Sequence, residues 1–228
     1  MAKTKNRGAH KAVADNPKET VDSLDVREAA AENPNTSAEA LNKLATDKKM
    51  DVRWGVAGNP STPTETLAKL ATNKSDDVRR AVARNPNTPA DVLAVLATEE
   101  DIFVCCAVAK NRRTPVELLA ELVMNKYWQV RRVVARNPNA PAEALAELAT
   151  HKSSNVRQAV AENPSTPAEM LNKLAMDEDS RVRQAVARNA KIPPEAITLL
   201  CFSEESDIRK ALSENPAVPE HIRVGLSL

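Results

Sequence analysis

The chain has 228 residues, of which 42% are hydrophobic and only 2% aromatic, so one ordinary domain with a core of leucine, valine and alanine is expected. Lysine and arginine number 32 and aspartate and glutamate 31, which excludes a strongly basic polyanion-binding protein and an acidic disordered chain. Three cysteines are too few for a disulfide framework, and no apolar run is long enough to cross a membrane, so we expect a cytoplasmic protein.

The N-terminal region is expected to have two parts. Residues 1–11 are polar and lack the apolar stretch of a signal peptide, which predicts a flexible tail. Residues 12–25 contain a truncated copy of a motif that recurs later in the chain. Its asparagine, Asn16, is separated from Asn33 by fewer residues than Asn33 is from Asn59, the next asparagine of the motif.

From position 26 to position 228 the sequence repeats with a constant 26-residue period and no insertion. Each repeat carries an asparagine that is usually followed by proline: Asn33, Asn59, Asn85, Asn111, Asn137, Asn163, Asn189 and Asn215. A unit of this length cannot close a core of its own, so each unit must stack on its neighbours. The sequence therefore predicts a single repeat domain over residues 12–228, with a truncated first unit in 12–25 and eight units in 26–228.

Each unit has the pattern of two helices, and no segment alternates polar and apolar residues as a half-buried strand would. The first helix follows a Thr-Pro-x-Glu motif, as in residues 62–65, which predicts a capping hydroxyl, a proline at the first helical position and a capping-box glutamate. Leucines three residues apart, such as Leu67 and Leu70, supply its buried stripe.

The second helix is expected to be short, for example residues 77–84, which leaves open a 3₁₀ or an α geometry. Asn85 is predicted to end this helix in the left-handed conformation, and Pro86 prevents its continuation. The fold class is therefore all-α.

The string V-R-x-A-V-A-x-N-P-x-T-P, as in residues 78–89 and 156–167, closely resembles the variant leucine-rich repeat proteins of bacteria, which are similar in shape to HEAT-like solenoids. The resemblance spans residues 12–228 and implies a right-handed solenoid of alternating helices, without the strands of ordinary leucine-rich repeats. One described member of that family carries an N-terminal cysteine cluster that holds iron and sulfur. No cysteine precedes Cys105 here, so that cofactor is not expected.

No catalytic, metal or cofactor motif is recognisable, and we expect a protein that is not an enzyme. His10, His151 and His221 are isolated, and His151 occupies a polar position that is Asp47 in an earlier unit. The three cysteines are interpreted as substitutions at repeat positions: Cys105 replaces a recurring arginine, Cys106 an outward residue and Cys201 a core alanine. A reactive Cys105 and Cys106 pair remains the alternative.

An arginine recurs in the second helix of seven units: Arg27, Arg53, Arg79, Arg131, Arg157, Arg183 and Arg209. This row of guanidinium groups predicts either a site for phosphates or an acidic peptide, or a structural element bonded to helix-end carbonyls and to Asp47 or Asp177. We favour the structural interpretation, and we interpret the recurring asparagines in the same way.

Positions that vary between units are the candidates for function. Basic residues gather on the outward side of the middle second helices, and the few aromatic residues lie in or beside the links there, as residues of binding hot spots do. The candidate partner-binding residues are Trp54, Arg80, Arg84, Phe103, Lys110, Arg112, Arg113, Tyr127, Trp128, Arg132 and Arg136. The alternative for the aromatic residues is that they cap the core under a degenerate repeat.

These observations predict a scaffold that binds another protein or a peptide, and the basic residues suit an acidic one. The alternative is a solenoid that binds nucleic acid, with phosphates on a stripe formed by Arg80, Arg84, Lys110, Arg132 and Arg136. The near-neutral net charge and the scarcity of stacking aromatics argue against it. A spacer without a specific partner is the third reading, and a membrane partner is not expected.

Overall fold

The computed structural model describes residues 23–226, so His10, the predicted tail 1–11 and nearly all of the truncated unit 12–25 lie outside it. Within the described residues all regular structure is α-helical, with sixteen helices and no strand, which confirms the all-α prediction. These residues divide into two compact units, unit 1 with residues 23–113 and unit 2 with residues 114–226.

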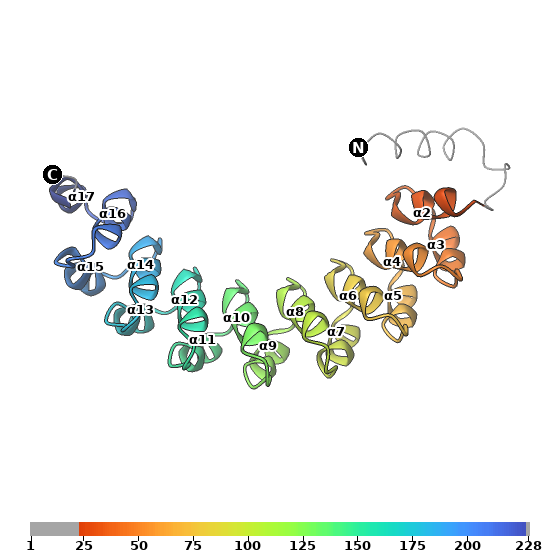
Figure 1. Cartoon of the computed structure of the whole chain (residues 1–228), viewed down its shortest axis with the longest axis horizontal. Helices are drawn as coiled ribbons and strands as arrows, with labels where there is room; N and C mark the ends of the chain where they lie inside the picture. Colours follow the sequence, from red (N-terminus) through yellow and green to blue (C-terminus); the bar gives the residue numbers. More distant parts are fainter. Residues whose placement is uncertain (1–22, 227–228) are drawn as a thin grey trace. The chain divides into compact units, whose positions relative to one another are not determined.

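Within each unit, helices of two kinds alternate along the chain, and the even-numbered second helices form one row and the odd-numbered first helices another (Figure 1). Unit 1 contains α2 (Leu24–Glu32), α3 (Ala38–Leu44), α4 (Met50–Gly58), α5 (Thr64–Leu70), α6 (Asp76–Arg84), α7 (Ala90–Ala97) and α8 (Ile102–Lys110). Unit 2 contains α9 (Val116–Leu122), α10 (Trp128–Arg136), α11 (Ala142–Leu148), α12 (Ser154–Glu162), α13 (Ala168–Leu174), α14 (Ser180–Arg188), α15 (Pro194–Cys201), α16 (Ser206–Glu214) and α17 (Glu220–Leu226).

The core of each unit lies between the two rows of helices. The predicted leucine stripe of the first helices is buried, as Leu67 and Leu145 show, and valines such as Val82 and Val160 meet it from the second helices. Burial of each such side chain stabilises the fold by about 1.5 to 3 kcal/mol. Consecutive second helices pack directly on one another, so small side chains are needed at their contacts.

The second helices are regular α-helices, which decides between the 3₁₀ and α geometries that the sequence left open. They have nine residues, as in α6, and are longer than the first helices, which have seven or eight. A second helix such as α6 packs against the second helices before and after it as well as against first helices. Nine residues favour the α geometry, because 3₁₀ helices have poorer hydrogen-bond geometry and rarely exceed about four residues.

The predicted helix caps are wrong. The Thr62 hydroxyl does not cap α5; it donates a hydrogen bond of 2.6 Å to the carbonyl oxygen of Val56, near the end of the preceding second helix, while Pro63 occupies the cap position. Asn85 is extended, with φ −65° and ψ 128°, and not left-handed. A following proline is not the cause, because Asn111 and Asn189, which no proline follows, are extended as well, with ψ of 130° and 128°. What these positions share is the bond from the asparagine side chain to a carbonyl of the preceding repeat.

The recurring asparagines tie each repeat to the one before it. The Asn85 Nδ2 amide donates to the carbonyl oxygens of Ala57 and Asn59, both at 2.8 Å, while its Oδ1 accepts from the Asn87 N–H at 2.9 Å. Equivalent bonds to two carbonyls of the preceding repeat are made by Asn59, Asn111, Asn163, Asn189 and Asn215. These side chains are buried, so the structural interpretation of the asparagines is confirmed.

Asn163→Ala is expected to destabilise the chain by about 3 kcal/mol, because the buried carbonyls of Ala135 and Asn137 lose their donor. Asn163→Asp keeps the acceptor for the Ser165 N–H but lacks the amide donors, so it should be as damaging as alanine. Urea unfolding followed by circular dichroism measures both. A mild effect of Asn163→Asp would mean that the local turn, and not the bond between repeats, is what the asparagine supplies.

Candidate functional site

The row of arginines is held by the fold at two points. From Arg53 onward, each head group donates through Nη1 to a carbonyl oxygen six residues earlier, as Arg79 does to Asn73 at 2.7 Å and Arg157 to His151 at 2.8 Å. The link that follows the next first helix carries the second partner, twenty residues after the arginine. Where that residue is an acid, Nε also forms an ion pair with it, as Arg79 does with Glu99 at 2.8 Å. The structural interpretation of this row is therefore confirmed, and these guanidinium groups are engaged within the protein.

The residue in the next link decides whether the arginine Nε has a partner. Asp177 uses Oδ1 to accept from the Asp179 N–H and Oδ2 to accept from Arg157 Nε at 2.6 Å. Asn73 keeps the first bond, to the Ser75 N–H, but offers no second oxygen. Arg53 stands in the same relation to Asn73 as Arg157 does to Asp177, and its buried Nε accordingly has no hydrogen-bond partner.

Asn73→Asp is expected to stabilise the chain by about 1 kcal/mol, because the new carboxylate oxygen gives Arg53 Nε its partner. The reverse change in unit 2, Asp177→Asn, should destabilise by about 2 kcal/mol, since it removes the partner of the buried Arg157. Urea unfolding midpoints check both changes. If Asn73→Asp loses stability, the arginine row does not set the preference for an acid at this position.

His151 occupies the same position in its repeat and faces Arg131, whose Nε is buried without a partner. Its Nδ1 accepts a hydrogen bond from the Ser153 N–H at 2.9 Å, which requires that this nitrogen be unprotonated. Burial, followed by the charge of Arg131, lowers the pKa of His151 below its ordinary value of 6.5. His151 is therefore a structural residue held in its neutral form.

His151 is expected to make the fold sensitive to mild acid. Its pKa is lower in the folded chain than in the unfolded chain, so the unfolded chain binds the extra proton first and stability falls as pH decreases below about 6.5. His151→Asn keeps an acceptor for the Ser153 N–H but does not titrate. Between about pH 7.5 and about pH 5 the wild type should lose more stability than this variant in urea unfolding. Equal losses would contradict the assignment.

The surroundings of Cys105 and Cys106 bear on whether they form a reactive pair. Cys105 is buried and its Sγ donates to the Glu99 carbonyl at 3.2 Å, the position that the arginine head group takes in other repeats. Burial, followed by the charges of Cys105 and Asp101, raises the pKa of the Cys106 thiol. A raised pKa disfavours the thiolate, which argues against a reactive pair.

In unit 1, the predicted partner-binding residues lie on the second helices, except for Arg112 and Arg113, which lie in the turn after α8. Arg84 and Lys110 are exposed at the ends of α6 and α8, and neither forms an ion pair with a described residue. Phe103 is 61% exposed in the first turn of α8, and the Arg80 guanidinium lies 5.9 Å from its ring centre. Trp54, on α4, is 44% exposed.

In unit 2, the predicted residues have more partners within the chain. Arg136 pairs with Glu162 at 2.9 Å, and the Nε of Arg132 is buried without a partner. Tyr127 and Trp128 are half-buried at the start of α10, and the Lys126 ammonium lies 5.1 Å from the Tyr127 ring centre. The expectation that Phe103 and Trp128 lie in links is wrong, because both belong to the first turns of helices, whereas Tyr127 does lie in the link before α10.

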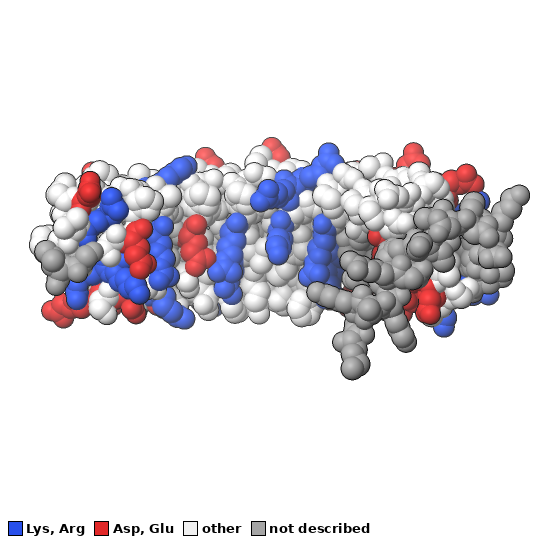
Figure 2. Space-filling model, turned by 90° about the horizontal axis from the view of Figure 1, so that it is seen from above, with Lys and Arg blue, Asp and Glu red and all other residues white. Residues whose placement is uncertain are grey.

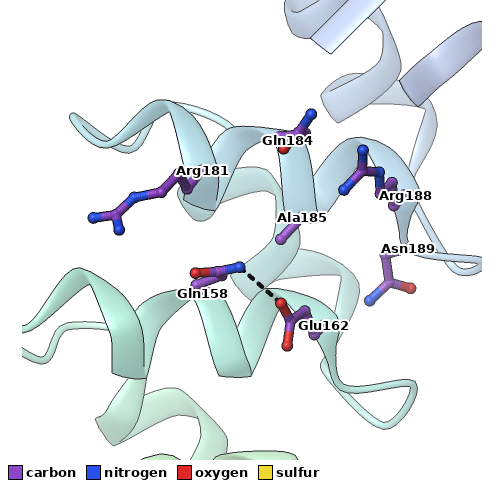
Figure 3. Close-up of a pocket in the computed structure, with 7 residues that line it drawn as sticks. All are labelled: Gln158, Glu162, Arg181, Gln184, Ala185, Arg188 and Asn189. Carbon is purple, nitrogen blue, oxygen red and sulfur yellow. Dashed lines mark hydrogen bonds between the residues drawn. The ribbon is translucent and has the colours of Figure 1, made fainter. Parts of the chain in front are cut away.

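The second helices bound two equivalent grooves, one in each unit. The groove of about 390 Å³ in unit 1 is lined by Arg84, Pro86, Ala107, Lys110, Asn111 and the pair Arg112 and Arg113. The groove of about 140 Å³ in unit 2 lies between α12 and α14 (Figure 3) and is lined by Gln158, Glu162, Arg181, Gln184, Ala185, Arg188 and Asn189. Glu162 and Arg188 stand three repeats after Arg84 and Lys110.

Sequence reasoning found the cations of unit 1 but missed their surroundings. It did not identify Pro86, Ala107 and Asn111 as groove residues, nor Glu162 as the partner of Arg136. The 26-residue spacing was the available signal, because it places Arg136 and Glu162 at equivalent positions of successive second helices. Phe202, 83% exposed after α15, was also missed.

Two further features are defined by the described residues. No helix among residues 23–226 combines the length and the apolar character that crossing a membrane requires. Over the same residues, histidine, cysteine, aspartate and glutamate side chains do not gather in groups of three that would suit a metal ion.

The sequence matches two related family models. A Leucine Rich Repeat Variant domain model matches residues 51–102 and 131–190, and a Leucine rich repeat variant model matches 24–48, together more than half of the chain. A solved leucine-rich repeat variant with a novel repetitive structural motif is 26% identical, with 92% of this chain and 81% of that chain covered and a TM-score of 0.62. An engineered protein is 21% identical, with 97% and 82% covered and a TM-score of 0.45. A search of curated proteins finds no match.

Proposed function

This chain belongs to the leucine-rich repeat variant family, and we propose that it is a scaffold, not an enzyme, that binds another protein or peptide through the outward side of its second helices. The proposed contact residues in unit 1 are Trp54, Arg80, Arg84, Phe103, Lys110, Arg112 and Arg113. Those in unit 2 are Tyr127, Trp128, Arg132 and Arg136.

The observation that carries this proposal is the exposed Phe103 ring beneath the Arg80 guanidinium. An aromatic ring exposed to this extent contributes little to the core, and arginine and aromatic residues dominate the energy of protein interfaces. Arg80 is oriented by Asp77, one turn earlier on α6, so the guanidinium is placed over the ring before a partner arrives.

Nucleic-acid binding is the alternative, and the exposed Arg84 and Lys110 are the observation in its favour. The rest of the predicted stripe is weakened by acidic partners, because Arg80 pairs with Asp77 and Arg136 with Glu162. In unit 2 acidic side chains alternate with basic ones on this face (Figure 2), as Glu162 does with Arg136 and Arg188. A phosphate backbone would meet repulsion at each of these acids.

Phe103→Ala is expected to weaken the binding of a protein partner by about 2 kcal/mol or more, which is roughly thirtyfold in Kd. The matched control is Phe202→Ala, which removes a still more exposed phenylalanine from unit 2. Affinity purification with quantitative mass spectrometry, with and without nuclease, compares both variants with the wild type. Stability should change little in either variant, as checked by thermal melts.

The proposal requires that some proteins are enriched with the wild type and with Phe202→Ala and are depleted with Phe103→Ala. Treatment with nuclease must leave their enrichment unchanged. Enrichment that disappears with nuclease would favour the nucleic-acid alternative. Equal enrichment with both variants would remove Phe103 from the interface.

A further inference from the structure

The groove of unit 1 carries four positive charges and no negative one. Arg84 and Lys110 contribute them from the last turns of α6 and α8, and Arg112 and Arg113 from the turn after α8. Pro86 and the buried Ala107 supply apolar surface in the same groove. Like charges at neighbouring exposed positions repel one another, so mutual attraction does not explain why these cations lie together.

Two of these cations replace residues that the repeat uses structurally. In most repeats the recurring turn reads Asn-Pro followed by a short polar residue, and Asn87 Nδ2, at that last position, donates to the Pro60 carbonyl at 2.6 Å. Here Arg112 stands in place of the proline and Arg113 in place of the short polar residue. Arg113 Nη1 still reaches the Pro86 carbonyl, but at 3.5 Å. The repeat is therefore preserved while two guanidinium groups are added to the groove.

The equivalent groove of unit 2 shows what the repeat itself requires. Ala185 and Asn189 take the places of Ala107 and Asn111, but Glu162 replaces Arg84 and faces the groove with Arg188 (Figure 3). Gln158 donates to Glu162 at 2.8 Å, and Glu162 also pairs with Arg136. A groove that includes an acid and fewer cations is thus compatible with the fold, and the excess of cations in unit 1 is not needed for packing.

We propose that the groove of unit 1 binds the carboxylates of an acidic peptide segment. This inference rests on the proposed function and names the chemistry of the partner. Guanidinium groups hold carboxylates through paired hydrogen bonds, and three of the four cations here are arginines. The groove is large enough for an acidic side chain and its neighbours. The apolar surface of Pro86 and Ala107 contacts the methylene groups of such a side chain.

The surroundings of the groove favour a peptide over nucleic acid. The row that contains Arg84 and Lys110 also contains three acidic residues, Glu32, Glu162 and Glu214. Arg136, which follows Lys110 in this row, is paired with Glu162, so the row is not a continuous track of available cations. A nucleic-acid strand presents a charge at every nucleotide and needs such a track. A peptide segment with a few clustered carboxylates matches a single groove.

Phe103 adds a second, apolar contact to the same surface. It lies seven residues before Lys110 on α8, which places the two on one helix face at about 10 Å along the axis. An extended chain covers that distance in about three residues. The partner is therefore an acidic segment with an apolar side chain about three residues from its carboxylates.

The test measures the binding of fluorescent probe peptides to the full-length chain by anisotropy. The probe is a peptide of glutamates with one leucine, and the reference probe has glutamine in place of every glutamate. We expect the glutamate probe to bind at least tenfold more tightly than the reference, and to weaken at least tenfold in the variant Arg84→Glu/Lys110→Glu. An oligothymidylate of equal net charge should bind more weakly than the glutamate probe.

Arg188→Glu is the control, because it reverses the one cation of unit 2 that is equivalent to Lys110, while Glu162 already stands at the position equivalent to Arg84. It should alter the probe Kd less than twofold. Arg84→Gln/Lys110→Gln, which introduces no negative charge, should also weaken the glutamate probe. If both double variants bind the glutamate probe as tightly as the wild type does, the groove assignment is overturned. It is also overturned if the wild type binds the oligothymidylate more tightly than the glutamate probe. A glutamate probe that fails on the wild type overturns the acidic-peptide inference, whereas the scaffold proposal fails separately if Phe103→Ala depletes no protein.

Discussion

The structure depends on a buried asparagine amide that recurs in every repeat from Asn59 onward. Its two donors take two carbonyls of the preceding repeat and its oxygen holds its own turn, as Asn85 does for Ala57, Asn59 and Asn87. A buried carbonyl without a donor costs stability, so the partners must recur at fixed distances along the chain. This requirement explains why the period has no insertion: an extra residue in a repeat would move the amide away from both acceptors.

The arginine row adds a second connection that tolerates more variation. Its bond to a carbonyl six residues earlier is local, and Cys105 can replace the guanidinium with a thiol that reaches the equivalent carbonyl. The ion pair through Nε depends on the residue twenty positions later, because Asp177 supplies a second oxygen for Arg157 whereas Asn73 and His151 supply none for the arginines that face them. All three side chains accept the backbone hydrogen bond that forms their own turn. The backbone is thus held by amides that cannot change, while the charge on the edge of each repeat varies.

The sequence alone was sufficient to predict the all-α fold class, the 26-residue period and the leucine core, because these depend on local periodicity that nothing in the fold opposes. It was insufficient for Thr62 and Asn85, whose side-chain partners lie in other helices: a hydroxyl before a proline looks like a helix cap until the carbonyl of Val56 is placed beside it. The candidate site was found only as residue types. The groove of unit 1 appears when α6 is placed beside α8, which brings Arg84 and Lys110 to one surface.

The two grooves separate what the repeat requires from what it permits. Ala107 and Asn111 recur in unit 2 as Ala185 and Asn189, because the packing of one second helix on the next needs a small residue and a buried amide. The outward residues face no such constraint, and in unit 2 they alternate in sign so that Arg136 finds Glu162. The residues that line the groove of unit 1 include no acid, and Arg112 replaces a proline that most other repeats keep. A surface that departs from its own repeat at several neighbouring positions, in the direction of one charge, is most simply explained by the negative charge of what it binds.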